Sequence, residues 1–275
     1  TAFGGIDTWV HAAAVALYAR FEDTTPAEFA RVIEVNLLGQ VHGALAALPR
    51  LRERGQGAFI SISSVEARRA FPYHSAYAAA KHGVDGFLEA LRVELREEGV
   101  PIAVTNVMPG SINTPLFDKA RTKLGVKPQP PPPIYEPETV ARVILHAARH
   151  PARDLVAGGA GAAIVGQERL SPAMFDALLV RLGFRTQRTD EPKRVTDPDN
   201  LFEPIVGFPA ERGNFHALRH SAFNWLETHA PTRPIRALAS RPPRLRDSPE
   251  PAYYENRAVA TARSLRARLV DSATS

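Results

Sequence analysis

Cysteine is absent from the 275 residues of this chain, and so are long uninterrupted apolar runs. Without cysteine, disulfide bonds, thiolate catalysis and thiolate metal sites are excluded. No stretch of apolar residues approaches the roughly 18–20 residues of a membrane span, and Ala12–Leu17 is merely a short one. The formal net charge is only +5, from 34 Lys and Arg against 29 Asp and Glu, so we expect no dedicated nucleic-acid binder.

The composition divides the chain into a folded body and an extension. With 44% hydrophobic residues, most of the chain can bury a core, which excludes a wholly disordered protein. Up to residue 185, apolar segments alternate with Gly and Pro, whereas residues 186–275 contain 10 Pro and little sustained periodicity. We therefore predict one domain over residues 1–185 and an extension over residues 186–275 that is partly helical or disordered.

Strands and helices are expected to alternate within the body. Thr25, Pro26 and Glu28 provide a helix start, with an N-cap hydroxyl, a first-turn proline and an acid that can close a capping box. Strands separated by helices predict a parallel sheet that is covered on both faces. The expected strands are residues 6–12, 58–63, 101–108 and 154–157, and the expected helices are residues 26–54, 75–98 and 137–150.

Four side chains in this frame can carry chemistry. Tyr77 and Lys81 are four residues apart on a predicted helix, so both project from the same face. A phenol ionises near pH ~10, and a neighbouring ammonium lowers that pKa toward the range of a usable acid or base. Ser64 follows a strand, where its hydroxyl can polarise a carbonyl, and Asn36 interrupts the apolar rhythm of the long helix. Taken singly, each also fits a solvated helix face, a turn or a surface amide.

Taken together, these residues resemble the short-chain dehydrogenase/reductase family. The resemblance rests on Ile62-Ser63-Ser64, on the thirteen residues from Ser64 to Tyr77, on Tyr77-Ala-Ala-Ala-Lys81, and on two flanking motifs at residues 35–39 (Val-Asn-Leu-Leu-Gly) and 107–115 (Val-Met-Pro-Gly-Ser-Ile-Asn-Thr-Pro). It covers roughly residues 5–165. It implies a Rossmann-like doubly wound parallel sheet and an oxidoreductase that uses NAD or NADP on an alcohol or ketone.

The resemblance also implies a role for each of the four side chains. Tyr77 would exchange a proton with the alcohol or carbonyl, and Ser64 would hydrogen-bond the substrate oxygen. Lys81 would lower the pKa of Tyr77 and hold the ribose hydroxyls, and Asn36 would maintain a helix break and a relay water. No metal is implied. The cofactor-binding set would be Ala12, Ala13, Ala14, Asn36, Tyr77, Lys81, Pro109, Gly110, Ile112 and Thr114.

The sequence departs from the family in two places. The family's Asn-Asn-Ala-Gly reads His11-Ala12-Ala13-Ala14 here, and we expect His11 to be structural rather than a catalytic base. The chain opens at Thr1 with no Gly-rich phosphate turn, so we expect an N-terminally truncated domain that starts near the family's fourth strand. Residues 158–161 (Gly-Gly-Ala-Gly) are not expected to replace that turn, because no suitable helix and partner strand are predicted after them.

The truncation has consequences for the expected activity. The residue that would choose between NAD and NADP is missing, and we expect this chain alone to bind either cofactor weakly and to be inactive as a fragment. The functional label then belongs to the complete enzyme, which we expect to be cytoplasmic and homo-oligomeric. Residues 116–135 would form its variable substrate lid, with apolar contacts from Leu116 and Phe117.

A second function, from a different class, remains open. The chain could be a non-catalytic remnant or scaffold whose basic tail contacts a protein or a membrane. Apolar residues recur at helical spacing over residues 214–228 and again over residues 254–270, where four arginines accompany them. A basic amphipathic helix can lie on an anionic membrane, although it more often packs on its own domain. No nucleic-acid module surrounds the arginines, so a nucleic-acid partner is not expected.

Overall fold

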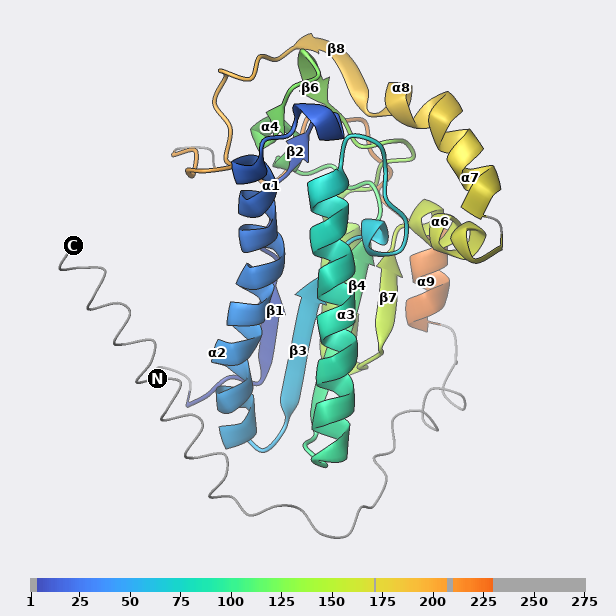
Figure 1. Cartoon of the computed structure of the whole chain (residues 1–275). Coiled ribbons are helices and arrows are strands. Elements are labelled where there is room, and N and C mark those ends of the chain that lie inside the picture. The colour runs from blue at the N-terminus through green and yellow to red at the C-terminus, as the bar shows by residue number, and fades with distance from the viewer. Residues whose placement is uncertain (1–3, 171, 207–209, 230–275) are drawn as a thin grey trace, which may run out of the picture.

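A computed structural model of the chain describes residues 4–170, 172–206 and 210–229 (Figure 1). Its centre is a parallel sheet of four strands in the order β1-β3-β4-β7. These strands are β1 (Thr8–His11), β3 (Gly57–Ile62), β4 (Ile102–Pro109) and β7 (Asp154–Ala157). The carboxyl ends of parallel strands meet at one edge of the sheet, and the functional residues predicted above follow these ends. The predicted parallel sheet is confirmed.

Two long helical segments run side by side along one face of the sheet (Figure 1). The first consists of α1 (Pro26–Ile33), η2 (Glu34–Leu38) and α2 (Gly39–Glu53), and the second is α3 (Ser75–Glu97). The predicted capping box is present, since the Thr25 side chain accepts from the Glu28 N–H while the Glu28 carboxylate accepts from the Thr25 N–H. This reciprocal pair satisfies two of the N–H groups that a helix start leaves without partners.

The two central strands, β3 and β4, bury residues on both faces of the sheet, with alternate residues on opposite faces. Phe59 and Val104 pack with Leu51 and Leu88 under α2 and α3. Ile60 and Val107 belong to the cluster on the opposite face, which helix α5 (Pro137–Arg149) covers through Val143 and Ala147. Burial on both faces explains why β3 and β4 read as nearly continuous apolar runs, whereas the residues of β1 are exposed or half-buried.

By length and composition alone, one helix among the described residues, Pro26–Glu53, could cross a membrane. Core helices of soluble proteins satisfy the same criterion. Ala44, Ala47 and Leu51 of this helix are buried in the core against the sheet. We therefore assign its apolar character to packing within the fold.

The remaining elements are short and gather around the carboxyl ends of the strands. Strand β2 pairs with β5 in parallel, and β6 pairs with β8 in antiparallel orientation. These elements are β2 (Leu17–Tyr18), η1 (Phe21–Asp23), η3 (Val65–Ala67), α4 (Leu116–Lys119), β5 (Arg121–Thr122), β6 (Val126–Pro128), α6 (Gly159–Leu170), α7 (Pro172–Leu178), η4 (Leu179–Gly183), α8 (Phe184–Thr186), β8 (Arg188–Pro192) and α9 (Ala222–His229).

Packing continues beyond the boundary predicted at residue 185. Strand β8 pairs with β6, Leu201 is completely buried in a cluster with Val32, and Asn224 caps the backbone at Gly158. The helix expected over residues 214–228 is shorter than predicted, because α9 begins only at Ala222. The second helix expected in the extension, over residues 254–270, lies outside the described residues.

A buried carboxylate joins the first helix to the distant β5 region. The Glu28 side chain is 5% exposed, and it pairs with Lys123 at 2.7 Å and with Arg121 at 3.3 Å. Arg121 also bonds Asp199 at 2.8 Å, which ties residues near 200 to the same cluster. Burial raises the pKa of Glu28, but hydrogen bonds from Lys123 and Thr25 outweigh it and lower the pKa to about 2.

We predict that Glu28→Gln removes part of the acid sensitivity of the fold. Because the folded-state pKa lies below the unfolded value of 4.5, the charge stabilises the fold above pH 4.5, and this stabilisation is lost between pH 4.5 and about 2. The free energy of unfolding of the wild-type protein should exceed that of the variant by up to about 3 kcal/mol near neutral pH, and this difference should vanish in acid. Urea unfolding across this pH range measures the difference, with a substitution of the exposed Glu34, Glu34→Gln, as the control. A difference that does not change with pH would contradict the prediction.

Candidate active site

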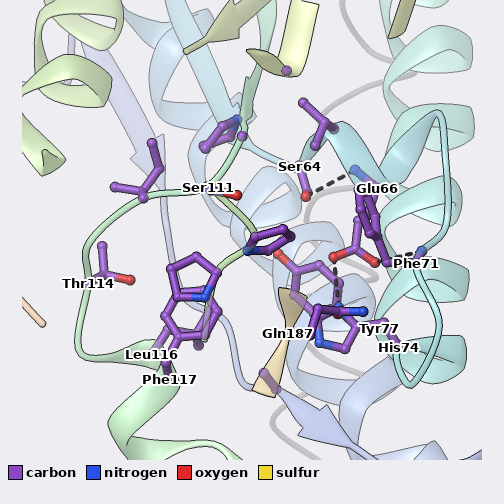
Figure 2. Close-up of a pocket in the computed structure, with 18 of the residues that line it drawn as sticks. Ser64, Glu66, Phe71, His74, Tyr77, Ser111, Thr114, Leu116, Phe117 and Gln187 are labelled. Atoms are coloured by element: carbon purple, nitrogen blue, oxygen red, sulfur yellow. Dashed lines mark hydrogen bonds and ion pairs between the residues drawn. The ribbon is translucent and has the colours of Figure 1, made fainter. Parts of the chain in front are cut away.

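A cavity of about 760 Å³ opens at the carboxyl ends of the central strands. Ser64, Tyr77 and Lys81 all line it. Ser64 follows β3 directly, whereas Tyr77 and Lys81 come from the first turns of α3. Figure 2 shows Ser64 and Tyr77 on one side of the cavity and Thr114, Leu116 and Phe117 on the other. The structure thus brings together three of the four predicted catalytic side chains.

The hydroxyl groups of Ser64 and Tyr77 line the same cavity. The Ser64 side chain lies near enough to the Tyr77 phenol to lower the pKa of that phenol. Ser64 Oγ also accepts from the backbone N–H of Glu66 at 3.1 Å, which fixes the serine as the cap of the short helix η3. Two hydroxyl groups this close can both hydrogen-bond one substrate oxygen, and a carbonyl oxygen has the two lone pairs to accept from both.

Lys81 is almost completely buried beneath Tyr77. Its Nζ lies 5.5 Å from the centre of the Tyr77 ring and donates to the carbonyl oxygen of Ile62 at 3.0 Å. Burial lowers the pKa of Lys81 to about 8, although the carboxylate of Glu66 acts in the opposite direction. The side chain therefore keeps its positive charge at neutral pH.

The surroundings of the Tyr77 phenol raise its pKa in this geometry, and the expected lowering by Lys81 stays a prediction. Burial raises the pKa of Tyr77 above its ordinary value of 10, the carboxylate of Glu66 raises it further, and the Ser64 side chain only partly offsets both. Desolvation disfavours the phenolate, and the ammonium of Lys81 is directed at Ile62 rather than at the phenol oxygen. Tyr77 is therefore a protonated phenol at neutral pH.

The sequence analysis missed a buried acid–histidine pair beside Tyr77. Glu66 Oε1 lies 2.7 Å from His74 Nδ1, and the His74 ring centre lies 5.4 Å from that of Tyr77 (Figure 2). An ionised carboxylate only accepts hydrogen bonds, so Nδ1 of His74 carries the proton in this pair. Glu66 and His74 both lie between Ser64 and Tyr77 in the sequence. The available signal in this segment was Glu66, an acid close to two arginines, Arg68 and Arg69.

Asn36 does not line the cavity. Its side chain is completely buried, and it holds the backbone of Val15 through both polar atoms, accepting from the N–H at 2.8 Å and donating to the C=O at 2.9 Å. It lies in η2, where the helix widens into a π-helical turn, so the expected helix irregularity is present. Asn36 therefore positions the segment after β1 and does not contact the cavity that a cofactor would enter.

Most of the remaining predicted cofactor residues do line the cavity. They are Ala12, Ala14, Pro109, Gly110, Ile112 and Thr114, whereas Ala13 is exposed and is not part of the wall. His11 lies outside the wall and packs on α2, where a Cβ on Gly43 would come within 2.3 Å of its Nδ1. Burial, followed by the charge of Lys81, lowers the pKa of His11, so a neutral packed imidazole fits the structural role expected of it.

Residues 158–161 lie at the start of a helix, so the expectation that no suitable helix follows them is wrong. Strand β7 ends at Ala157 and α6 starts at Gly159. Two N–H groups at this helix start have side-chain partners, because Gly158 donates to Asn224 Oδ1 at 2.7 Å and Ala160 donates to the Tyr135 hydroxyl at 3.4 Å. Side chains of the protein thus use part of the place where a phosphate would bind a helix N-terminus.

We predict that Asn36→Ala loosens the segment after β1. The substitution leaves the N–H and C=O of Val15 buried without their partner, so the free energy of unfolding should fall by about 2–4 kcal/mol. Amide hydrogen exchange at Val15 should accelerate. The amide of Ala19, which donates to Tyr73 O at 3.1 Å, is the internal control. Unchanged protection at Val15 would contradict the assignment.

We also predict that the Tyr77 phenol does not ionise between pH 7 and 10. Tyrosinate absorbance should therefore be the same in wild-type protein and in Tyr77→Phe across that range, because the raised pKa keeps the phenol protonated. In concentrated urea the two proteins should differ by one tyrosine that ionises near its ordinary pKa. An additional ionising tyrosine in folded wild-type protein below pH 10 would show that the phenol is activated.

The sequence of this chain is similar to those of short-chain dehydrogenases and oxidoreductases. The family model for short chain dehydrogenases matches residues 1–125. The uncharacterized oxidoreductase YxnA of Bacillus subtilis is 34% identical over 239 residues, which are 86% of this chain and 66% of that relative. D-beta-hydroxybutyrate dehydrogenase of Rhizobium meliloti is 38% identical over 117 residues, which are 42% of this chain and 45% of that relative.

The fold is also similar to a solved structure. The crystal structure of a short-chain dehydrogenase from Streptomyces avermitilis matches with a TM-score of 0.52 and 25% identity, covering 66% of this chain and 68% of that one. The chain spans about half to two thirds of the length of the curated relatives it matches.

Proposed function

This chain belongs to the short-chain dehydrogenase family, and we propose on that basis that the protein interconverts a carbonyl compound and its alcohol with a nicotinamide cofactor. The single observation that carries the proposal is that the hydroxyl groups of Ser64 and Tyr77 line one cavity above a buried Lys81. A hydroxyl pair of this kind holds and protonates one oxygen atom, which is what the reduction of a carbonyl requires.

The described residues fit one end of a nicotinamide cofactor. Ala12 and Ala14 are small enough for a flat ring to approach the strand ends, and Lys81 with Tyr77 supplies donors for ribose hydroxyls. At the start of α6, two backbone donors are already used by Asn224 and Tyr135, which leaves that helix fewer N–H groups for a pyrophosphate. When bound, NADH or NADPH would supply the hydride, and no described residue chooses between the two.

The protonated Tyr77 phenol supplies the proton that carbonyl reduction requires. Tyr77 is a protonated phenol, so it can donate its proton to a carbonyl oxygen without first acquiring one. Ser64 holds the same oxygen, and the charge of Lys81 stabilises the phenolate that remains after the transfer. Oxidation of an alcohol needs that phenolate at the start, which the raised pKa disfavours.

We predict that Tyr77→Phe lowers kcat/KM for ketone reduction by about 10²–10⁴-fold, because the substitution removes the proton donor and keeps the ring. Oxidation of NADH and of NADPH, each at saturating concentration, measures the rate. Saturation-transfer NMR of the nicotinamide protons should show that the cofactor still binds. Tyr73→Phe, which changes a tyrosine in the same segment but outside the cavity wall, should stay close to wild type.

Two outcomes would overturn this proposal. If Tyr77→Phe retains the wild-type rate, Tyr77 is not the proton donor. If the wild-type protein neither binds nor oxidises either cofactor, the second function considered above, a non-catalytic scaffold, becomes the better account.

A further inference from the structure

One wall of the cavity comes from residues beyond the part matched by the family model. Phe175, Leu178, Leu179 and Leu182 line it from α7 and η4. Their spacing of three and four residues places them on one helical face. The prolines at 130–133 line the cavity as well, from the loop that follows β6. Large apolar side chains therefore extend along the cavity away from Ser64 and Tyr77.

This wall is attached to the segment that carries the catalytic residues. The Arg69 guanidinium lies 5.0 Å from the centre of the Phe175 ring and pairs with Asp176. Farther along, Gln187 Nε2 donates to Pro72 O at 3.1 Å and to Gly183 O at 2.8 Å. The apolar wall and the segment between Ser64 and Tyr77 are thus joined at two points. These contacts fix the position of α7 and η4 relative to the catalytic residues.

The charged side chains of the cavity offer little to an anionic substrate. Glu66 contributes a carboxylate beside Tyr77, and its field raises the pKa of both Tyr77 and Lys81. Lys81 is buried and directs its ammonium to Ile62 O. Lys119, on the opposite side, has an interaction partner of its own. Among the described residues of the cavity wall, both lysines already have interaction partners, so a substrate carboxylate would meet the charge of Glu66 without an ammonium directed at it.

We propose that the substrate is an uncharged carbonyl compound with an apolar arm, which lies against the wall formed by α7 and η4, and that Glu66 disfavours anionic substrates. This inference rests on the proposed function. In the reaction, the carbonyl carbon gains a hydride and the carbonyl oxygen gains the proton of Tyr77, which yields a secondary alcohol and the oxidised cofactor.

Three related compounds separate the effects of charge and of the apolar arm. Methyl 3-oxooctanoate is neutral and has a long arm, 3-oxooctanoate has the same arm and a carboxylate, and methyl 3-oxobutanoate is neutral and short. The long ester should bind at least about tenfold more tightly than the short one, since each buried methylene contributes about three- to fourfold. It should also bind at least about tenfold more tightly than the long acid, because like charges disfavour the acid.

Variants assign each preference to its residue. Leu179→Ser should reduce the preference for the long ester over the short one, and Val180→Ser is the matched control because Val180 is 72% exposed and does not line the cavity. Glu66→Gln keeps the shape of the side chain and removes its charge, so the preference for ester over acid should shrink while the preference for the long arm remains.

Two measurements keep this inference separate from the proposed function. Ligand-observed NMR gives the dissociation constants without turnover, and oxidation of NADH or NADPH gives the rates. Binding in the predicted order without turnover would uphold the substrate class and overturn the redox function. Turnover with a preference for 3-oxooctanoate or for the short ester would overturn the substrate class and uphold the redox function.

Discussion

The carbonyl oxygen of Ile62 is the point on which the arrangement of the site depends. It accepts from Lys81 Nζ at 3.0 Å and from Gln40 Nε2 at 2.9 Å, so both of its lone pairs are used. These two bonds join α3 and α2 to the end of β3, directly before Ser63 and Ser64. A buried ammonium is costly unless it is hydrogen-bonded, and this carbonyl supplies the partner that keeps Lys81 beneath Tyr77.

Electrostatics then determine what the site can do. Glu66 lies two residues after Ser64, and its charge raises the pKa of Tyr18 and Tyr77 while it supports the positive charge of Lys81. Burial acts in the same direction on both phenols and in the opposite direction on the lysine. The result is a site that holds a protonated phenol next to a hydroxyl, as a proton donor to a carbonyl requires.

Much of this structure could be predicted from the sequence because it depends on local patterns. The capping box at Thr25 and Glu28 involves residues three positions apart, and the strands of the sheet show as apolar runs between turns. The pairing of Tyr77 with Lys81 follows from helical spacing, and its position relative to Ser64 followed from the family resemblance.

The features that were missed depend on partners far away in the chain. Asn36 was predicted at a helix break, but its partner Val15 lies 21 residues earlier, and no periodicity identifies that contact. The raised pKa of Tyr77 follows from burial and from Glu66, which only the folded geometry reveals. The apolar face of α7 and η4 was not predicted, and its position across the cavity depends on contacts with Arg69 and Pro72.

The proposed chemistry is that Tyr77, beside Ser64, protonates a carbonyl oxygen while a hydride reaches the carbonyl carbon. The most direct test incubates the protein with a neutral ketone and with NADH or NADPH that carries deuterium at both C4 positions of the nicotinamide, followed by mass spectrometry of the alcohol. We expect one deuterium on the carbinol carbon of the product, and its appearance should be strongly slowed in Tyr77→Phe. An alcohol without deuterium, or no alcohol with either cofactor, would contradict the claim.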